Sequence, residues 1–385
     1  MDFNLTPEQE ALRTLVRRFA TTEVAPRAAA IDRDGVLPDD ILRQAGTLGL
    51  LGVLTPAEYG GARMGYLALA LVVETLAAVC ASTAMVVDVH VSTVIDPLQR
   101  FASPEQKARW LPDLTQGKQL GAFAISEPEA GSDIAAIRTR AVRKGDTYVL
   151  NGHKTFITNA DRANLYIVFA STEPSAGSRG ISAFVVERDT PGMTCGAPMA
   201  KMGLNGSSIA EVHFEDCHVP RRHLLTEEGN GFKIAMITLD YGRIGIASQA
   251  VGIAQGAFSY ALDYARQRQA FGQPIVEFQG IQFLLADLAT RIEAARHLVY
   301  KAAHVADTDD ARLSRFAAMA KLFASETAMQ VTTEAVQILG GHGYMKEHPV
   351  ERMMRDAKAS QIYEGTSQIQ RLVIARRLLE EHAPV

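Results

Sequence analysis

The 385-residue sequence has only three cysteines, Cys80, Cys195 and Cys217, and none of them forms a C-x-x-C pair. An odd number of dispersed cysteines is not the pattern of a disulfide framework or of a zinc site. The chain begins Met1-Asp2-Phe3-Asn4, without the basic and apolar segments of a secretory signal. We therefore expect reduced thiols, a cytoplasmic location and no metal site.

A strong charge of one sign and a long uninterrupted apolar run are also absent. The 39 Lys and Arg residues against 43 Asp and Glu residues give a net charge of −4, so we expect no nucleic-acid partner and no anionic membrane surface. The most apolar stretch, residues 66–87, is interrupted by Glu74. An ionisable group in a membrane span is costly. The stretch therefore predicts a buried helix and no membrane insertion.

Several common catalytic motifs are missing as well. The sequence has no G-x-G-x-x-G after a strand-like run, no G-x-x-x-x-G-K-[ST], no H-E-x-x-H and no G-x-S-x-G. These absences argue against a doubly wound nicotinamide-binding fold, a phosphate-binding loop, a zinc hydrolase and a serine hydrolase of the nucleophile-elbow type.

What the sequence does contain divides it into three regions. Residues 1–120 are typical of helices, beginning with the capping box Thr6-Pro7-Glu8-Gln9 and apolar residues at helical spacing. Residues 121–230 contain short strand-like runs, and Asn151-Gly152 between two of them predicts a hairpin. Residues 231–385 return to apolar residues spaced by three and four. We expect an α+β fold, mostly α: an N-terminal helical domain, an antiparallel β domain and a C-terminal four-helix bundle.

Two segments are candidates for chemistry. The segment 124–133 combines small residues with Ser126 and Ser132, and it could run along a flat polar ligand; the alternative is a turn capped by Asp133. In the segment 361–371, Glu364 lies in an uncharged stretch beside Gly365. A carboxyl group in an apolar pocket has a raised pKa, which suits a general base. The alternative is a solvated glutamate at the start of a helix.

Two further positions could bind a pyrophosphate. Arg268 precedes Phe271-Gly272, and Gln337 precedes Gly340-Gly341. Arginine offers a permanent charge and forked donors that fit phosphate oxygens. The alternative for the lone arginine is an ordinary surface residue.

Taken together, these segments resemble the acyl-CoA dehydrogenase family, and the likeness covers nearly the whole chain. The sequence around residues 239–249 looks most similar to the short-chain, butyryl-type members. The motifs that carry the resemblance, in order along the chain, are Ala124 to Asp133, Lys154 to Asn159, Leu239 to Gln249, Gln337 to Tyr344 and Ile362 to Gln370.

The resemblance implies FAD as the cofactor and a short or branched acyl-CoA as the substrate, with a thioester on an acyl-carrier protein as the alternative. It implies dehydrogenation to the trans-2-enoyl-CoA, an electron-transferring flavoprotein as the electron acceptor, and a homotetramer built on the C-terminal bundle. Glu364 would remove the substrate's α proton, and the hydride would pass to flavin N5. Some relatives place the base at the position of Gly242, which has no side chain to act.

The resemblance also assigns binding residues, of which Arg268, Gln279 and residues 337–341 would reach the FAD of a neighbouring subunit. The cofactor-binding residues it implies are Phe123, Ala124, Ile125, Ser126, Gly131, Ser132, Phe156, Ile157, Thr158, Arg268, Phe271, Gln279, Gln337, Ile338, Gly340, Gly341, Thr366 and Gln368. The substrate-binding residues it implies are Ser132, Asp240, Tyr241, Gly242, Arg243 and Gly365.

Two departures from the family pattern bear on function. Phe156 stands where many members carry Trp, which keeps an aromatic wall without an N–H group. Asn205 stands where Arg is common, which argues against the family's polar contact from this loop and points to an unusual acyl or carrier group. Two other functions fit the same residues: an acyl-CoA oxidase that passes electrons to oxygen, and a catalytically silent scaffold. The sequence does not determine acyl length, branching, the thioester carrier or the pathway.

Overall fold

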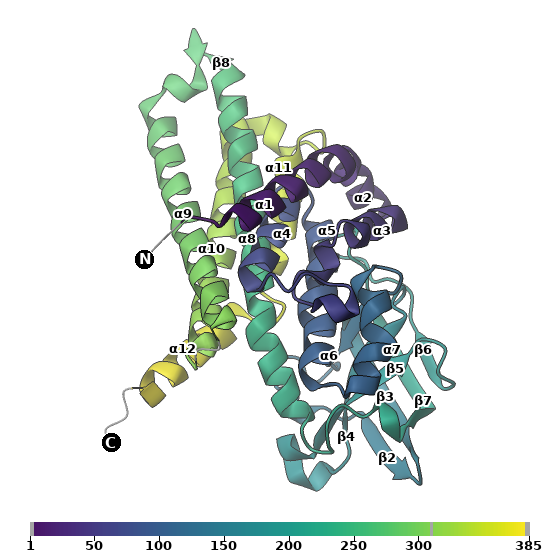
Figure 1. Cartoon of the computed structure of the whole chain (residues 1–385). Coiled ribbons are helices and arrows are strands. Elements are labelled where there is room, and N and C mark those ends of the chain that lie inside the picture. The colour runs from purple at the N-terminus through teal and green to yellow at the C-terminus, as the bar shows by residue number, and fades with distance from the viewer. Residues whose placement is uncertain (1–3, 309–310, 382–385) are drawn as a thin grey trace.

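The computed structural model describes residues 4–308 and 311–381, so the first three residues, on which the argument against a secretory signal rests, lie outside it. Figure 1 shows the three parts of the chain in the predicted order. The N-terminal helices, in purple and blue, lie between a strand-containing part at the lower right and three long helices on the left. The fold class, mostly α with a β middle, is confirmed.

The N-terminal part is helical, as predicted. Its first helix begins with the expected capping box: the Gln9 amide donates to Thr6 Oγ1 (3.3 Å), and the Thr6 amide donates to Gln9 Oε1 (2.9 Å). The α-helices of this part are α1 (Pro7–Phe19), α2 (Ala28–Asp34), α3 (Asp39–Thr47), α4 (Tyr66–Ala77), α5 (Ala81–Asp88), α6 (Asp96–Phe101) and α7 (Pro104–Thr115).

The apolar stretch 66–87 forms two buried helices, α4 and α5, where the sequence predicted one. The charged Glu74 is tolerated within the apolar helix α4 because its carboxylate has partners. It accepts hydrogen bonds from Arg296 Nε (2.8 Å) and from the Tyr300 hydroxyl (3.1 Å) on a C-terminal helix. This half-buried ion pair fixes the N-terminal helices to the bundle. No helix within residues 4–308 and 311–381 is long and apolar enough to cross a membrane.

The middle part is a seven-stranded sheet in the order β1-β4-β2-β3-β7-β6, with β5 paired to β4. The prediction of an antiparallel domain is wrong in detail, because β1 runs parallel to β4 and β2 meets β4 in parallel at Arg140 and Ser171. The strands are β1 (Gly121–Ala124), β2 (Arg140–Lys144), β3 (Thr147–Thr158), β4 (Leu165–Ser171), β5 (Ile181–Glu187), β6 (Met193–Cys195) and β7 (Ile209–Pro220).

The predicted hairpin at Asn151-Gly152 is also wrong. Both residues lie inside the single strand β3, and the β2–β3 turn is at residues 145–146. A register shift in the pairing of β3 with β7 falls between Leu150 and Gly152. A side chain at Gly152 would overlap Thr139, since its Cβ would lie 2.4 Å from Thr139 Oγ1. This glycine therefore marks a bulge with close backbone approach rather than a turn.

The C-terminal part is the predicted helical bundle. The long helix α10 packs against α8, α9, α11 and α12, and α4 packs against α8 and α9. The apolar cores of the two helical parts are continuous, so the proposed boundaries at residues 120 and 230 stay predictions. The elements are α8 (Gly231–Gln267), β8 (Gln269–Ala270), β9 (Gln273–Pro274), α9 (Gln279–Asp307), α10 (Leu313–Leu339), α11 (Pro349–Ala359) and α12 (Ser367–Glu381).

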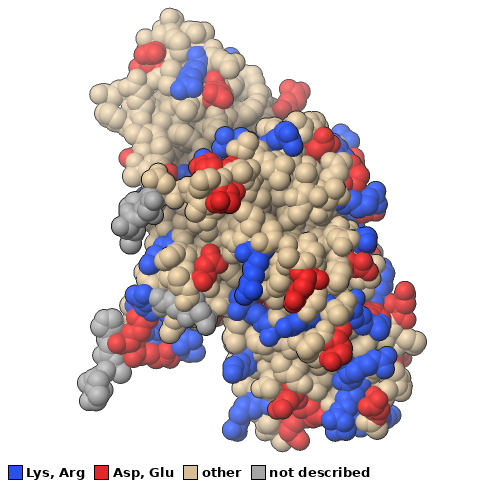
Figure 2. Space-filling view, viewed as in Figure 1, with Lys and Arg blue, Asp and Glu red and all other residues tan. Residues whose placement is uncertain are grey.

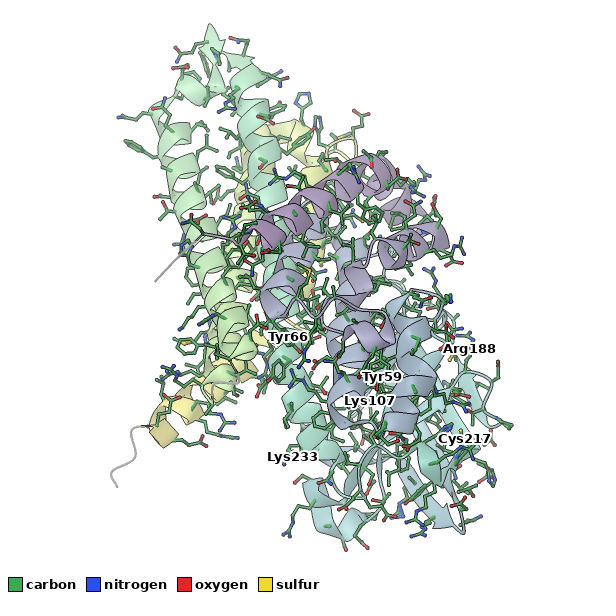
Figure 3. The ribbon with its side chains drawn as sticks, viewed as in Figure 1. Tyr59, Tyr66, Lys107, Arg188, Cys217 and Lys233 are labelled. Carbon is green, nitrogen blue, oxygen red and sulfur yellow. The ribbon has the colours of Figure 1, made fainter. Side chains whose placement is uncertain are left out.

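Helix α8 connects the two ends of the molecule. Its first residue, Gly231, lies against Ser182 of β5, and its last turn leads into the β8–β9 ribbon at the far end of the bundle. Figure 3 labels Lys233 near the start of α8 and, farther up the molecule, Tyr66, the first residue of α4, whose ring packs against Tyr241 of α8. With 37 residues, α8 is about 55 Å long. Groups at its two ends therefore cannot share one small ligand within a single chain.

Candidate active site

Glu364 lies in the loop between α11 and α12 and adopts a left-handed backbone conformation. Its φ is +51°, and Gly365 follows with φ +92°. A non-glycine residue in this region is strained and persists only where its surroundings fix it. Here the buried Lys321 donates to the Gly365 carbonyl (2.6 Å), and the buried Gln370 amide donates to the same oxygen (2.8 Å) and to the Glu364 carbonyl (3.2 Å).

The Glu364 carboxyl group faces Gly242 on α8. A Cβ atom at position 242 would lie 2.6 Å from Glu364 Oε2 and 3.2 Å from its Cδ. No side chain fits there unless the carboxyl group moves. Gly242 therefore makes the room in which Glu364 lies, in agreement with the prediction that position 242 holds no base.

The electrostatic environment of Glu364 suits proton transfer near neutral pH. Burial raises the pKa of its carboxyl group to about 7, although the Lys321 ammonium and the Arg243 guanidinium oppose the rise. Burial also lowers the pKa of Lys321 to about 7, against the attraction of Glu364. Glu364 Oε2 is buried and finds no hydrogen-bond partner among the described residues. A carboxyl group that is half ionised at pH 7 and not committed to a protein donor can act as a base.

The predicted substrate residues on α8 are held by other protein groups. Asp240 and Arg243 form an ion pair, and the Ser314 hydroxyl donates to Asp240 Oδ1 (3.2 Å). Tyr241 is buried, with its ring 4.9 Å from that of Tyr66. The charge of Arg243 also lowers the pKa of Glu364. A contact between Arg243 and a CoA group stays a prediction.

Tyr241 has a second neighbour that the sequence did not single out. The Arg100 guanidinium lies 3.7 Å from the centre of the Tyr241 ring, a cation–π distance. Arg100 is fixed by an ion pair with the buried Asp96 (2.7 Å). These contacts join α6 to α8 at the residue that directly precedes Gly242.

The first group of predicted cofactor residues is brought together by the sheet. The Thr155 amide donates to the Ser126 carbonyl (3.0 Å), so the segments 123–126 and 156–158 lie side by side. Phe156 has φ +57° and a 64% exposed side chain. Ser126 and Thr158 are half-buried, whereas Gly131 and Ser132 are exposed.

Three members of that first group do not present side chains to a ligand. Ala124 and Ile157 pack in the core on one face of the sheet, and Ile125 packs in the core on the other face. If they contact a cofactor, they do so through the main chain.

A buried ion pair that the sequence analysis missed fixes these segments. Lys154 is fully buried, and its Nζ contacts Glu127 Oε1 (2.7 Å) and the Ile125 carbonyl (3.1 Å). The Glu127 carboxylate also accepts from the Arg138 and Thr139 amides. Burial lowers the pKa of Lys154 to about 8, against the attraction of Glu127. Burial raises the pKa of Glu127, but Lys154 and the hydrogen bonds outweigh it and the net pKa is lowered. The only sign of this pair in the sequence was that Glu127 and Lys154 are charged residues within two of the motifs that carry the family resemblance.

The second group of predicted cofactor residues lies at the opposite end of α8. Arg268 follows its last residue, Phe271 is 97% exposed in the β8–β9 turn, and Gln279 begins α9. The Tyr264 hydroxyl contacts His342 Nδ1 (3.1 Å), which places residues 340–344 beside the same end. Gln337, Gly340 and Gly341 are exposed there, while the Ile338 side chain is buried. Within one chain, this second group therefore lies far from the first group of predicted cofactor residues, which is at the sheet.

The remaining predicted residues lie near Glu364 and near the N-terminal helices. Thr366 Oγ1 accepts from the Ile369 amide (3.3 Å) at the start of α12, and Gln368 is exposed beside it. Asn205 donates to Asp32 Oδ1 (2.9 Å) and to the Asp32 carbonyl (3.2 Å). The polar contact of the Asn205 loop is therefore made inside the chain.

One group in the described part of the chain has side chains close enough to share a metal ion: His153 on β3 with Glu211 and His213 on β7. The two imidazole rings stack with centroids 4.3 Å apart, and each Nε2 lies 3.3 Å from a Glu211 oxygen. The spacing of motifs gave no sign of this group because its histidines meet across two strands. The absence of a metal site stays a prediction.

Comparison with known proteins agrees with this arrangement. The family models for the N-terminal, middle and C-terminal domains of acyl-CoA dehydrogenase match residues 6–118, 122–217 and 229–379. A short-chain specific acyl-CoA dehydrogenase of Clostridium acetobutylicum is 46% identical, over 98% of this chain and 100% of the relative.

Two solved structures superimpose over 98% of this chain and 100% of their own. Butyryl-CoA dehydrogenase from Megasphaera elsdenii gives a TM-score of 0.96 at 45% identity. A structure described under the electron transferring flavoprotein of Acidaminococcus fermentans gives 0.97 at 47%. The chain belongs to the acyl-CoA dehydrogenase family, whose members are FAD-dependent oxidoreductases.

Proposed function

We propose that the protein dehydrogenates a short or branched acyl-CoA between its α and β carbons and that Glu364 removes the α proton. The observation that supports this most directly is the Glu364 carboxyl group itself. It is held in a strained loop against Gly242, its pKa is raised to about 7, and its Oε2 is not bonded to any group the structure describes. The similarity to short-chain and butyryl-CoA dehydrogenases supports a short acyl group.

The residues of the sheet fit FAD. The half-buried Ser126 and Thr158 hydroxyls can bond to the polar edge of a flavin, and the exposed Phe156 ring, set by a left-handed backbone, can cover a flat ring system. Bound FAD supplies the acceptor for the hydride that leaves the β carbon. The buried Lys154–Glu127 pair holds the two segments that carry these groups at a fixed separation.

The chain's own contribution to the reaction is to polarise the thioester and to receive a proton. The C–H group at the α carbon of a thioester is a weak acid. The thioester carbonyl must therefore be polarised before a carboxylate can remove the α proton. We assign this role to the Glu364 main-chain N–H, because a fixed donor in a site that excludes water stabilises the developing negative charge. The Glu364 carboxylate then holds the α proton, and the product is the trans-2-enoyl-CoA.

A homotetramer explains why the predicted cofactor residues fall in two places. Arg268, Phe271 and Gln279 would complete the FAD site of a neighbouring copy, since they cannot reach their own sheet. Large apolar side chains are exposed at that end of the bundle: Phe271 (97%), Phe283 (62%), Tyr344 (86%) and Met345 (54%). Figure 2 shows mostly uncharged atoms at the upper end of the bundle and interspersed charges elsewhere. Such an exposed apolar surface is typical of an interface.

The proposal includes an electron acceptor and a cellular location. The similarity to a structure described under an electron transferring flavoprotein supports such a protein as the acceptor. Cys80, Cys195 and Cys217 are free thiols, as expected in a reducing compartment. This agrees with a cytoplasmic location.

The direct test is the bleaching of bound FAD by acyl-CoA without oxygen. The purified yellow protein is mixed anaerobically with butyryl-CoA, isovaleryl-CoA and octanoyl-CoA, and the flavin absorbance is followed. We expect fast bleaching by one of the two short substrates and slower bleaching by octanoyl-CoA. Failure of all acyl-CoAs to bleach the flavin would refute the proposal. Stoichiometric peroxide on turnover in air would instead identify an oxidase.

A further inference from the structure

A second carboxyl group, Asp88, is buried beside Glu364 and has no role in the reaction described above. Asp88 is the last residue of α5, and its exposed fraction is 0%. Neither of its carboxyl oxygens has a hydrogen-bond partner in residues 4–308 or 311–381. Buried polar groups are almost always hydrogen-bonded, so two orphaned oxygens on one carboxyl group need an explanation.

Asp88 and Glu364 lie along the same face of α8. A Cβ at Gly245 would lie 1.8 Å from Asp88 Oδ1, as a Cβ at Gly242 would lie 2.6 Å from Glu364 Oε2. Positions 242 and 245 are three residues apart, so they are neighbours on one helix face, about 5–6 Å from each other. Two glycines in consecutive turns thus make room for two carboxyl groups that are not hydrogen-bonded to each other.

One side of the pair is lined by apolar side chains. Met85, Val89 and Ile246 form a small buried cluster, with Tyr363 packed against it, apart from the main core. The Ser92 hydroxyl is bonded to the Asp88 main-chain carbonyl (2.8 Å). The charged groups nearby are Glu364 itself, Arg243 on α8, which is paired with Asp240, and Lys321 on α10, which is bonded to the Gly365 carbonyl. Asp88 therefore faces an apolar wall and a second carboxyl group.

We propose that Asp88 contacts the acyl group of the substrate and recognises a hydroxyl on it, so that the preferred substrate is a short hydroxyacyl-CoA rather than an unsubstituted one. This rests on the proposed function, which places the acyl group against Glu364. A hydroxyl both donates and accepts, so it pairs with either protonation state of a carboxyl group. Burial, and then the charge of Glu364, raise the pKa of Asp88 well above its ordinary value. An unsubstituted chain would leave the Asp88 oxygens unpaired, and sites built to bond a hydroxyl discriminate strongly against analogues without one.

The test compares matched substrates in the FAD-loaded protein. Anaerobic flavin reduction is measured with butyryl-CoA and 4-hydroxybutyryl-CoA, and with valeryl-CoA and 5-hydroxyvaleryl-CoA. For at least one pair, we expect the rate constant divided by the dissociation constant to be ~10-fold or more higher for the hydroxylated member. Asp88→Ala should reduce that ratio to about one or below, whereas Asp88→Asn, which keeps an acceptor oxygen and the shape of the side chain, should keep part of the preference.

The outcomes separate the two proposals. If no acyl-CoA bleaches the flavin, the proposed function fails. If butyryl-CoA and valeryl-CoA reduce the flavin at least as well as their hydroxylated partners, the role of Asp88 is overturned while the function stands. A hydroxyl preference that survives unchanged in Asp88→Ala also overturns it, because another group must then bind the hydroxyl. Should Asp88→Ala lose FAD, the ratio in Asp88→Asn decides: a preference reduced from that of the parent supports the contact, and an unchanged one refutes it.

Discussion

Replacing Gly242 by alanine should slow the reaction without unfolding the protein. The added methyl group would lie 2.6 Å from Glu364 Oε2, whereas ordinary contacts of such an atom begin near 3.4 Å, so the carboxyl group must retreat by about 0.8 Å. A misplacement of about 1 Å at a reacting group can cost ~10²-fold in rate. Alanine in the middle of a helix is favoured over glycine by about 1 kcal/mol, which offsets part of the local crowding. We expect an ~10²-fold slower flavin reduction and a melting temperature within a few degrees of the parent.

The assay is anaerobic stopped-flow reduction of the bound flavin by saturating butyryl-CoA. Gly196→Ala is a matched control, because a Cβ there meets Glu211 only at ordinary contact distances of 3.5–3.8 Å. Gly242→Ala is also combined with Glu364→Gln. If the methyl group acts by displacing the carboxylate, it should add little further loss once that carboxylate is gone. A Gly242→Ala variant as fast as the parent, or a full ~10²-fold loss added on top of Glu364→Gln, would refute the reasoning.

Three other predictions follow from buried charges. Lys154→Met leaves Glu127 buried without its cation, so we expect a destabilisation of ~3–5 kcal/mol and loss of FAD. Thermal unfolding and the flavin content of the purified variant test this expectation, and a melting temperature equal to the parent's would contradict it. Lys321→Met removes the ammonium that opposes the rise in the pKa of Glu364, so the pH at which flavin reduction reaches half its maximum should move to higher pH; an unchanged profile would argue against the coupling. The pKa of Glu364 is raised from 4.5 to about 7 in the folded protein, so the folded state binds more protons than the unfolded state between these values and the parent loses stability as the pH rises through them. Glu364→Gln does not ionise, so relative to the parent it should gain up to about 3 kcal/mol between pH 4.5 and pH 7, measured by denaturant unfolding at both ends of that range; a constant difference would contradict the raised pKa.

The sequence predicted those parts of the structure that depend on local pattern. The capping box at Thr6 and the long helices of the bundle follow from spacing along the chain, and both are present. The hairpin at Asn151-Gly152 failed because the same two residues suit a tight turn and a bulge, and the contact with Thr139 that selects the bulge comes from another segment. The parallel pairing of β1 with β4 was missed for the same reason, since strand direction is decided by distant parts of the chain.

The candidate site divides along the same line. Glu364 could be selected from the sequence because its motif is contiguous, and Gly242 because it stands at a position known from the resemblance. Asp88 and Lys154 could not, because their significance lies in burial and in partners more than 20 residues away. A charged residue in an apolar segment, as Asp88 is, was the one available signal.

The central claim is that the Glu364 carboxylate removes the substrate's α proton, and the most direct measurement is the rate at which butyryl-CoA reduces the flavin of Glu364→Gln without oxygen. Glutamine keeps the size of the side chain and removes the base. The account predicts that the variant binds FAD like the parent but reduces it ~10²–10⁴-fold more slowly. A variant that keeps its FAD and is reduced at the parent's rate would contradict the account.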